Sequence, residues 1–163
     1  MPEYFQQRLA YESAETFQPY TFASSGFAPD AIVINLGTND YSHCRQRPGG
    51  ECEAGFAQAF TKTYVDFMRN ATRWYDKPDI HFFCGVGPIT INYWPAVEAA
   101  VVLAKAQGLK ATLVDMQACN NMTGHALTNM TGGCQGCATH PGIEGHRRMY
   151  ELSYPTMKET LGW

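Results

Sequence analysis

Three short apolar runs that alternate with segments of helical periodicity constrain the fold of this chain more than any other feature. Each run is rich in β-branched or aromatic residues and is followed by loop-forming residues; the runs span residues 31–36, 80–86 and 111–116. Such runs are typical of strands that are buried on both faces of a parallel sheet. The sequence therefore predicts three parallel strands.

Helices are predicted between and after these strands. Apolar side chains recur at intervals of three or four residues in both connections, at Phe56, Phe60, Tyr64 and Phe67 and then at Trp94, Val97, Val101 and Ala104. This spacing gives each connection one apolar helix face. A last helix is predicted to start at Pro141 and to be interrupted by Pro155.

The order strand, helix, strand, helix, strand, helix predicts a parallel α/β sheet with helices on both faces, which is a three-layer α/β/α arrangement. A chain of 163 residues fits one domain, and no repeat or linker divides it. Functional residues in such sheets gather beyond the carboxyl ends of the strands. The residues that follow each predicted strand are therefore the first candidates for a site.

The charge of the chain is close to balanced. It has 12 Lys and Arg against 15 Asp and Glu, a formal charge of -3, and no basic stripe. Nucleic acid is therefore not an expected partner. The apolar runs are also far shorter than the roughly 20 residues needed to cross a bilayer, so we expect no membrane span.

Six cysteines and three N-glycosylation sequons, at Asn70, Asn121 and Asn129, favour an extracellular protein. The chain nevertheless starts without the basic and apolar regions of a signal peptide. Either the protein is cytosolic or its true N-terminus lies upstream of Met1. The motifs described below favour the second interpretation, in which the protein is secreted.

The cysteines are interpreted as structural disulfides. Cys44 and Cys52 bracket a short loop that contains Pro-Gly-Gly, and we predict that they are bonded to each other. Cys119 with Cys134 is the second candidate pair. Cys84 and Cys137 have no assigned partner.

Two segments at predicted strand ends carry candidate catalytic residues. Gly37-Thr38-Asn39-Asp40 follows the first strand, where the Asn39 amide could donate to an oxyanion; alternatively, it is a strand-to-helix turn whose polar side chains bind nearby backbone amides. His140 follows the third strand and could act as a general base; alternatively, it is an incidental loop histidine. Both segments belong to the same edge of the predicted sheet, which favours catalysis.

These segments resemble conserved blocks of the SGNH (GDSL-like) hydrolases. Residues 33–40, Val-Ile-Asn-Leu-Gly-Thr-Asn-Asp, look like the third block, and residues 140–146, His-Pro-Gly-Ile-Glu-Gly-His, look like the last. The start of the chain, residues 83–88 and a Gly-Cys element before His140 are similar to family-two carbohydrate esterases, which deacetylate plant polysaccharides. The resemblance implies a flavodoxin-like SGNH fold.

The same resemblance implies the roles of individual residues. His140 is expected to activate a serine, and Asn39 is expected to hold the oxyanion, with Gly37, Thr38 and Asp40 supporting its loop. The expected activity is that of a secreted serine carboxyl-ester hydrolase that acts on an acetylated carbohydrate or another small ester. No metal or organic cofactor is expected. The alternative is a non-catalytic carbohydrate-binding descendant of the same fold.

Two features depart from the superfamily pattern. Members begin with a Gly-Asp-Ser block on the first strand and a Gly-containing block after the second, and this sequence has neither. Residues 1–163 are therefore expected to be the C-terminal part of one SGNH domain, without its first two strands, its nucleophile or its signal peptide, and inactive alone. Cys137 stands where Asp is usual, which implies a Ser-His dyad in which a backbone carbonyl orients His140.

Three further interpretations involve the remaining motifs. Tyr93 and Trp94 follow the second strand and could stack on a sugar, but packing at a helix start is the preferred interpretation. Zinc binding by Cys134, Cys137 and His140, with Cys119 nearby, is disfavoured because such sites normally separate their two ligand pairs further. Thiol redox chemistry is disfavoured because the Cys-X-X-Cys does not open a helix directly after a strand.

Overall fold

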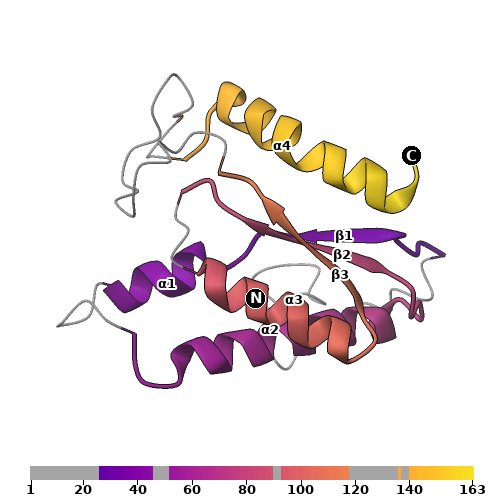
Figure 1. Ribbon diagram of the computed structural model, residues 1–163, viewed down its shortest axis with the longest axis horizontal. Helices are drawn as coiled ribbons and strands as arrows, with labels where there is room; N and C mark the ends of the chain where they lie inside the picture. The colour runs from indigo at the N-terminus through magenta and orange to yellow at the C-terminus, as the bar shows by residue number, and fades with distance from the viewer. Residues whose placement is uncertain (1–25, 46–51, 90–92, 118–135, 137–139) are drawn as a thin grey trace, which may run out of the picture.

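The structure is a computed structural model that describes residues 26–45, 52–89, 93–117, 136 and 140–163. The described chain contains three strands and four helices, with two helices between the first two strands (Figure 1). Their order is β1 (Ala31–Ile34), α1 (Thr38–Arg45), α2 (Phe56–Trp74), β2 (His81–Val86), α3 (Trp94–Ala106), β3 (Lys110–Asp115) and α4 (Ile143–Leu161).

The strands form one parallel sheet in the order β1-β2-β3, as predicted. Ala31 lies opposite His81, and His81 lies opposite Lys110, so the three strands begin in register. Because the strands are parallel, all their carboxyl ends lie at one edge of the sheet. This edge is the one at which the sequence predicts the site.

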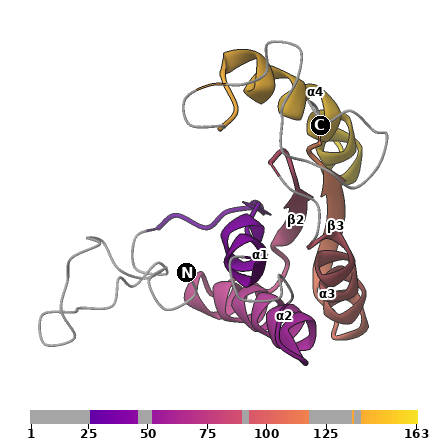
Figure 2. The same cartoon turned by 90° about the vertical axis from the view of Figure 1, so that its left-hand side faces the viewer.

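Helices cover both faces of the sheet, which confirms the three-layer α/β/α prediction. Helices α2 and α3 pack on one face, and α4 lies on the other (Figure 2). The α4 face is the smaller of the two cores: Met149, Met157 and Leu161 of the helix pack around Phe83 and Val114 of the sheet. The larger core lies under α2 and α3.

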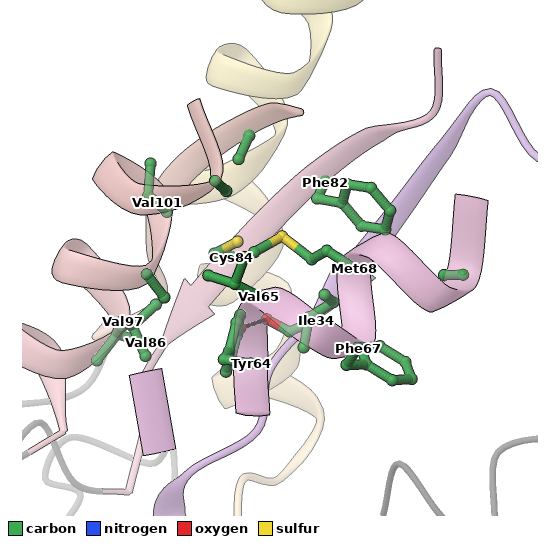
Figure 3. Close-up of a cluster of buried hydrophobic side chains, with 14 of the residues drawn as sticks. Ile34, Tyr64, Val65, Phe67, Met68, Phe82, Cys84, Val86, Val97 and Val101 are labelled. Carbon is green, nitrogen blue, oxygen red and sulfur yellow. Dashed lines mark hydrogen bonds between the residues drawn. The ribbon is translucent and has the colours of Figure 1, made fainter. Parts of the chain in front are cut away.

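The larger core is built from fully buried aliphatic, aromatic and sulfur-containing side chains (Figure 3). Met68 and Phe82 have no exposed surface. Tyr64 is buried beside them, and its hydroxyl donates to the backbone oxygen of Ile34 at 3.1 Å. This hydrogen bond ties α2 to the carboxyl end of β1, which is the strand that leads into the candidate site.

The structure corrects several predicted element boundaries. Helix α4 begins at Ile143, after Gly142 in an extended conformation, rather than at Pro141. Helix α4 continues through Pro155 to Leu161 rather than being interrupted there. Packing of Met157 and Leu161 on the sheet holds the last turns, so tertiary contacts outweigh the missing proline N–H. Strand β1 ends at Ile34, two residues earlier than predicted, and the chain then turns into a short helix, α1, that the periodicity did not reveal.

Within the described ranges, no helix combines the length and the apolar character that a membrane crossing needs.

Candidate active site

The turn after β1 carries Asn39 into the first turn of α1. Gly37 accepts the first helical hydrogen bond, from the Tyr41 N–H at 3.0 Å, so α1 starts directly beyond the carboxyl end of the strand. Asn39 and Asp40 lie in this first turn and are both exposed. The positive end of the helix dipole lies here too, and it favours negative charge. An amide donor and a helix N-terminus therefore share one position at the sheet edge.

Gly37 is needed for this turn. It is buried and has φ +130°, a conformation that side-chain-bearing residues rarely adopt. A Cβ atom at this position would lie 2.7 Å from Cδ2 of Tyr93 and 3.1 Å from Cζ of Phe60. The turn that presents Asn39 is therefore packed directly against two aromatic rings.

Tyr93 joins the turns after β1 and β2. Its side chain has no exposed surface. Its hydroxyl accepts hydrogen bonds from the Gly87 N–H at 3.1 Å and from the Thr38 hydroxyl at 3.3 Å. Gly87 precedes Pro88 through a cis peptide bond at the end of β2. One buried side chain thus holds two strand-end turns together.

The burial of Tyr93 bears on the two interpretations of its role. A fully buried ring has no open face for a sugar, so this burial favours the packing interpretation. Trp94, the first residue of α3, is half-buried and packs against the larger core. The sequence missed Tyr93 as a support for the Asn39 turn because its spacing shows only that it precedes a helix.

The ends of β2 and β3 also approach closely. The Met116 N–H donates to the Val86 oxygen at 2.9 Å, directly beyond the paired strands. A Cβ atom on Gly87 would lie within 2.8–2.9 Å of the Met116 and Gln117 backbones. The Gly-Pro pair after β2 is the sequence signal for this contact, since only glycine allows backbones to meet so closely.

His140 lies just before α4, and its side chain is exposed. Its backbone oxygen accepts the Gly136 N–H at 2.7 Å. Gly136 also lies against Gly142. A Cβ atom added to Gly136 would lie 3.0 Å from the Cα and N atoms of Gly142. These contacts place Gly136 beside the backbone of His140 and Gly142 at the start of the helix.

Asn39 and His140 belong to the same end of the sheet but to opposite faces. Helix α1 lies on the α2 side, whereas α4 begins on the other side at the same carboxyl edge (Figure 1). His140 lies in the connection between β3, which ends at Asp115, and α4, which begins at Ile143. The two candidate residues thus flank the carboxyl edge.

A small apolar cavity lies beneath the same turn. Its volume is about 110 Å³, and it lies between the end of β1 and α2, with Leu36, Asp40, Phe60 and Thr63 in its lining. Its neighbour Tyr64 has a raised pKa because burial disfavours the charged phenolate. Among the described residues that line the cavity, Asp40 and Tyr64 are the titratable ones.

The predicted Cys44–Cys52 disulfide is confirmed. The two Cα atoms are 4.6 Å apart, and the bond joins the end of α1 to the segment that precedes α2. It therefore closes the loop that follows the Asn39 helix. Cys84 is a buried free thiol.

The remaining predicted positions are divided between described and undescribed parts of the chain. Asn70 lies in α2 and is half-buried. The described residues contain no group of three His, Cys, Asp or Glu side chains that could hold a metal ion. The other predicted positions lie outside the described residues; these are Cys119, Asn121, Asn129, Cys134 and Cys137.

Comparisons with known proteins identify the family of the chain. A family model described as GDSL-like Lipase/Acylhydrolase matches residues 3–153. The cellulase/esterase CelE of Acetivibrio thermocellus is 29% identical over 160 residues, which covers 89% of this chain and 17% of that protein. The chain therefore spans about a sixth of the length of this curated relative.

Two solved structures have similar folds. A family two carbohydrate esterase from Clostridium thermocellum, in complex with cellohexaose, has a TM-score of 0.65 and 28% identity, covering 85% of this chain and 38% of its own. The acetyl xylan esterase Est2A from the rumen bacterium Butyrivibrio proteoclasticus has a TM-score of 0.63 and 18% identity, covering 91% of this chain and 41% of its own. The second likeness concerns the fold alone.

Proposed function

Because the chain belongs to the GDSL-like lipase/acylhydrolase family, we propose that it carries the general base and one oxyanion donor of a serine esterase that deacetylates a carbohydrate. The observation that carries this proposal is the position of Asn39 and His140 on either side of the carboxyl edge of the sheet. A carbohydrate substrate is supported by the cellohexaose complex of the similar family two esterase. The acetyl group is supported by the sequence resemblance to polysaccharide deacetylases.

His140 and Asn39 divide the work of the first half-reaction. His140 takes the proton of a serine hydroxyl as the serine oxygen attacks the acetyl carbonyl. The carbonyl oxygen becomes an oxyanion, to which the Asn39 NH₂ group donates, helped by the positive end of the α1 dipole. The intermediate collapses when the bond to the sugar oxygen breaks and His140 returns the proton to that oxygen. The deacetylated sugar leaves and an acetyl-serine remains.

Water completes the cycle by the same route. His140 accepts a proton from water as the water oxygen attacks the acetyl-serine, and Asn39 again holds the oxyanion. Collapse returns the proton to the serine and releases acetic acid, which ionises to acetate in water. The proposed dyad needs no carboxylate beside His140, since a backbone carbonyl orients the imidazole. No step requires a metal or an organic cofactor.

The nucleophile is proposed to lie outside these 163 residues. A serine nucleophile needs a sharp strand-to-helix turn that presents its hydroxyl at the sheet edge. Of the serines that the structure describes, Ser42 lies within α1, and Ser153 is buried in α4, where it donates to the Met149 oxygen at 2.7 Å. Neither has this setting. Ser13, Ser24 and Ser25 lie outside the described residues, and none occurs in a Gly-Asp-Ser block.

Joining the chain to its upstream coding segment tests the proposal. We expect that segment to contain Gly-Asp-Ser and the joined protein to hydrolyse p-nitrophenyl acetate and acetylated xylan. The 163-residue chain should show no turnover above background, and Ser→Ala in the block should abolish the gain. Serine-dependent hydrolysis by the 163-residue chain would refute the nucleophile assignment. An upstream segment without the block would favour a non-catalytic carbohydrate-binding protein.

Secretion is part of the same proposal. A polysaccharide substrate is found outside the cell, and the Cys44–Cys52 disulfide is typical of oxidising compartments. Acetylated carbohydrate is the proposed partner, and neither nucleic acid nor a membrane is required. Glycosylation at Asn70, Asn121 and Asn129 is proposed on the sequons alone.

A further inference from the structure

An open cavity lies at the amino edge of the sheet, opposite the candidate active site. It has a volume of about 480 Å³ and lies where the strands begin and α4 ends. Its lining includes Asp30, Asp79, His81, Lys110, Thr160 and Trp163. Six-residue strands such as β2 separate the two edges of the sheet by about 20 Å. This cavity is therefore distinct from the site that contains Asn39 and His140.

Trp163 presents an exposed aromatic side chain to this cavity. Gly162 adopts a left-handed conformation, with φ +73°, and its N–H and that of Trp163 both donate to the Lys158 oxygen, at 2.9 and 3.1 Å. The Gly162 bond is that of an αL cap and the Trp163 bond is the 6→1 bond of a Schellman motif, and both anchor the backbone after the helix. The Trp163 side chain is nevertheless 67% exposed. The backbone is held, and a large apolar ring is left open beside the cavity.

The charged groups at the cavity balance one another. Lys77 lies 3.2 Å from an Asp30 oxygen and 3.3 Å from an Asp79 oxygen, and Lys110 is the second cation beside the two carboxylates. The hydrogen bond from Lys77 holds the pKa of Asp79 below its usual range, so this carboxylate stays an acceptor at neutral pH. Burial, with Lys110 nearby, lowers the pKa of His81 and keeps it neutral there.

This combination selects the class of ligand. A free anion would meet two carboxylates, and a free cation would meet Lys110 and two carboxylates that are already paired with Lys77, so neither is favoured over the other. A neutral ligand with many hydroxyl groups can donate to Asp30 and Asp79, accept from Lys110 and lay an apolar face on the indole ring. We propose that this cavity is a second binding site, for a neutral oligosaccharide, and that it is separate from the proposed catalytic edge.

Titration of the 163-residue chain with cellohexaose and with xylohexaose tests the site. Isothermal titration calorimetry gives the affinity, and the indole N–H resonance of Trp163 in an NMR spectrum reports the location. At least one of the two sugars should bind and shift that resonance. Trp163→Ala should weaken the binding by about tenfold or more, the loss expected for an aromatic anchor. Trp163→Phe, which keeps a smaller aromatic ring, should retain part of the affinity that Trp163→Ala loses.

Two controls separate this site from the proposed catalytic one. Tyr150→Ala removes an exposed ring elsewhere on α4 and should leave the affinity unchanged. In His140→Ala and Asn39→Ala the sugar should still shift the Trp163 resonance, which reports this site alone. Binding that survives Trp163→Ala but is lost with Asn39→Ala would overturn the second site while supporting the proposed function. Failure of both sugars to bind at millimolar concentration would overturn it as well.

Discussion

At the scale of single residues, the geometry of the Asn39 turn depends on Gly37 and Tyr93. Gly37 leaves room for the Tyr93 ring, and the Tyr93 hydroxyl accepts hydrogen bonds from Thr38 on one turn and from Gly87 on the other. A catalytic donor has to be held in place before the charge develops, since its contribution depends on preorganisation. The sequence motif distinguishes Gly37 and Thr38, but it does not include Tyr93, the residue that both of them contact.

Tyr93→Phe tests this connection. The substitution keeps the buried ring but removes the acceptor for the Gly87 N–H, and leaving a buried donor unpaired costs about 1–3 kcal/mol. We expect the free energy of unfolding to fall by that amount in urea, with an unchanged m value. Tyr150→Phe, on an exposed ring, is the matched control and should have no effect. A loss below about 0.5 kcal/mol, the range of ordinary surface substitutions, would show that the hydroxyl does not hold the turns.

Cys84 provides a second test at this scale. Burial raises the pKa of its thiol to about 12, although a hydrogen bond with Tyr64 opposes the rise. The thiol therefore stays protonated and unreactive at pH 8 in the folded chain. Iodoacetamide should label Cys84 only after unfolding in urea, as read by mass spectrometry of its peptide. Rapid labelling under native conditions would mean that the core around β2 is not closed.

At the scale of elements, sequence periodicity predicted the strands and the helices that bury a regular apolar face. It failed where tertiary packing decides the outcome. Pro155 is a local signal to stop a helix, yet Met157 and Leu161 pack on the sheet beyond it. Helix α1 was missed because its sequence, Thr-Asn-Asp-Tyr-Ser-His-Cys-Arg, has no apolar face. Its position depends on the turn at Gly37 and on the disulfide at Cys44 rather than on periodicity.

Strand β1 has an open side in the described part of the chain. It pairs there with β2 alone, and Val33 is 51% exposed on the α4 face of the sheet. An apolar edge strand of this kind pairs readily with other chains. Val33→Lys should therefore reduce the self-association of the 163-residue chain in sedimentation velocity experiments. Val102→Lys, at an exposed valine on α3, is the matched control and should leave association unchanged.

Two results would contradict this prediction. A chain that remains a monomer at every concentration tested would show that the β1 edge does not associate. An equal effect of the two lysine substitutions would mean that added charge improves solubility in general, without any role for the strand edge.

At the scale of the whole molecule, the parallel sheet separates two regions with different chemistry. The carboxyl edge holds the candidate catalytic residues, and the amino edge holds the cavity beside Trp163. The sequence predicted the first region because strand order alone assigns Asn39 and His140 to one edge. It did not predict the second, because Asp30, Asp79 and Trp163 share no motif and meet only through the register of the strands and the end of α4.

The central claim is that His140 is the general base and Asn39 an oxyanion donor of one active site. The most direct measurement is kcat on p-nitrophenyl acetate for the joined protein and its variants. We predict that His140→Ala lowers kcat by more than about a thousandfold and that Asn39→Ala lowers it by about a hundredfold to a thousandfold. The control His146→Ala, at an exposed histidine of α4, should have little effect. Full activity in His140→Ala, with loss of activity in His146→Ala, would contradict the assignment.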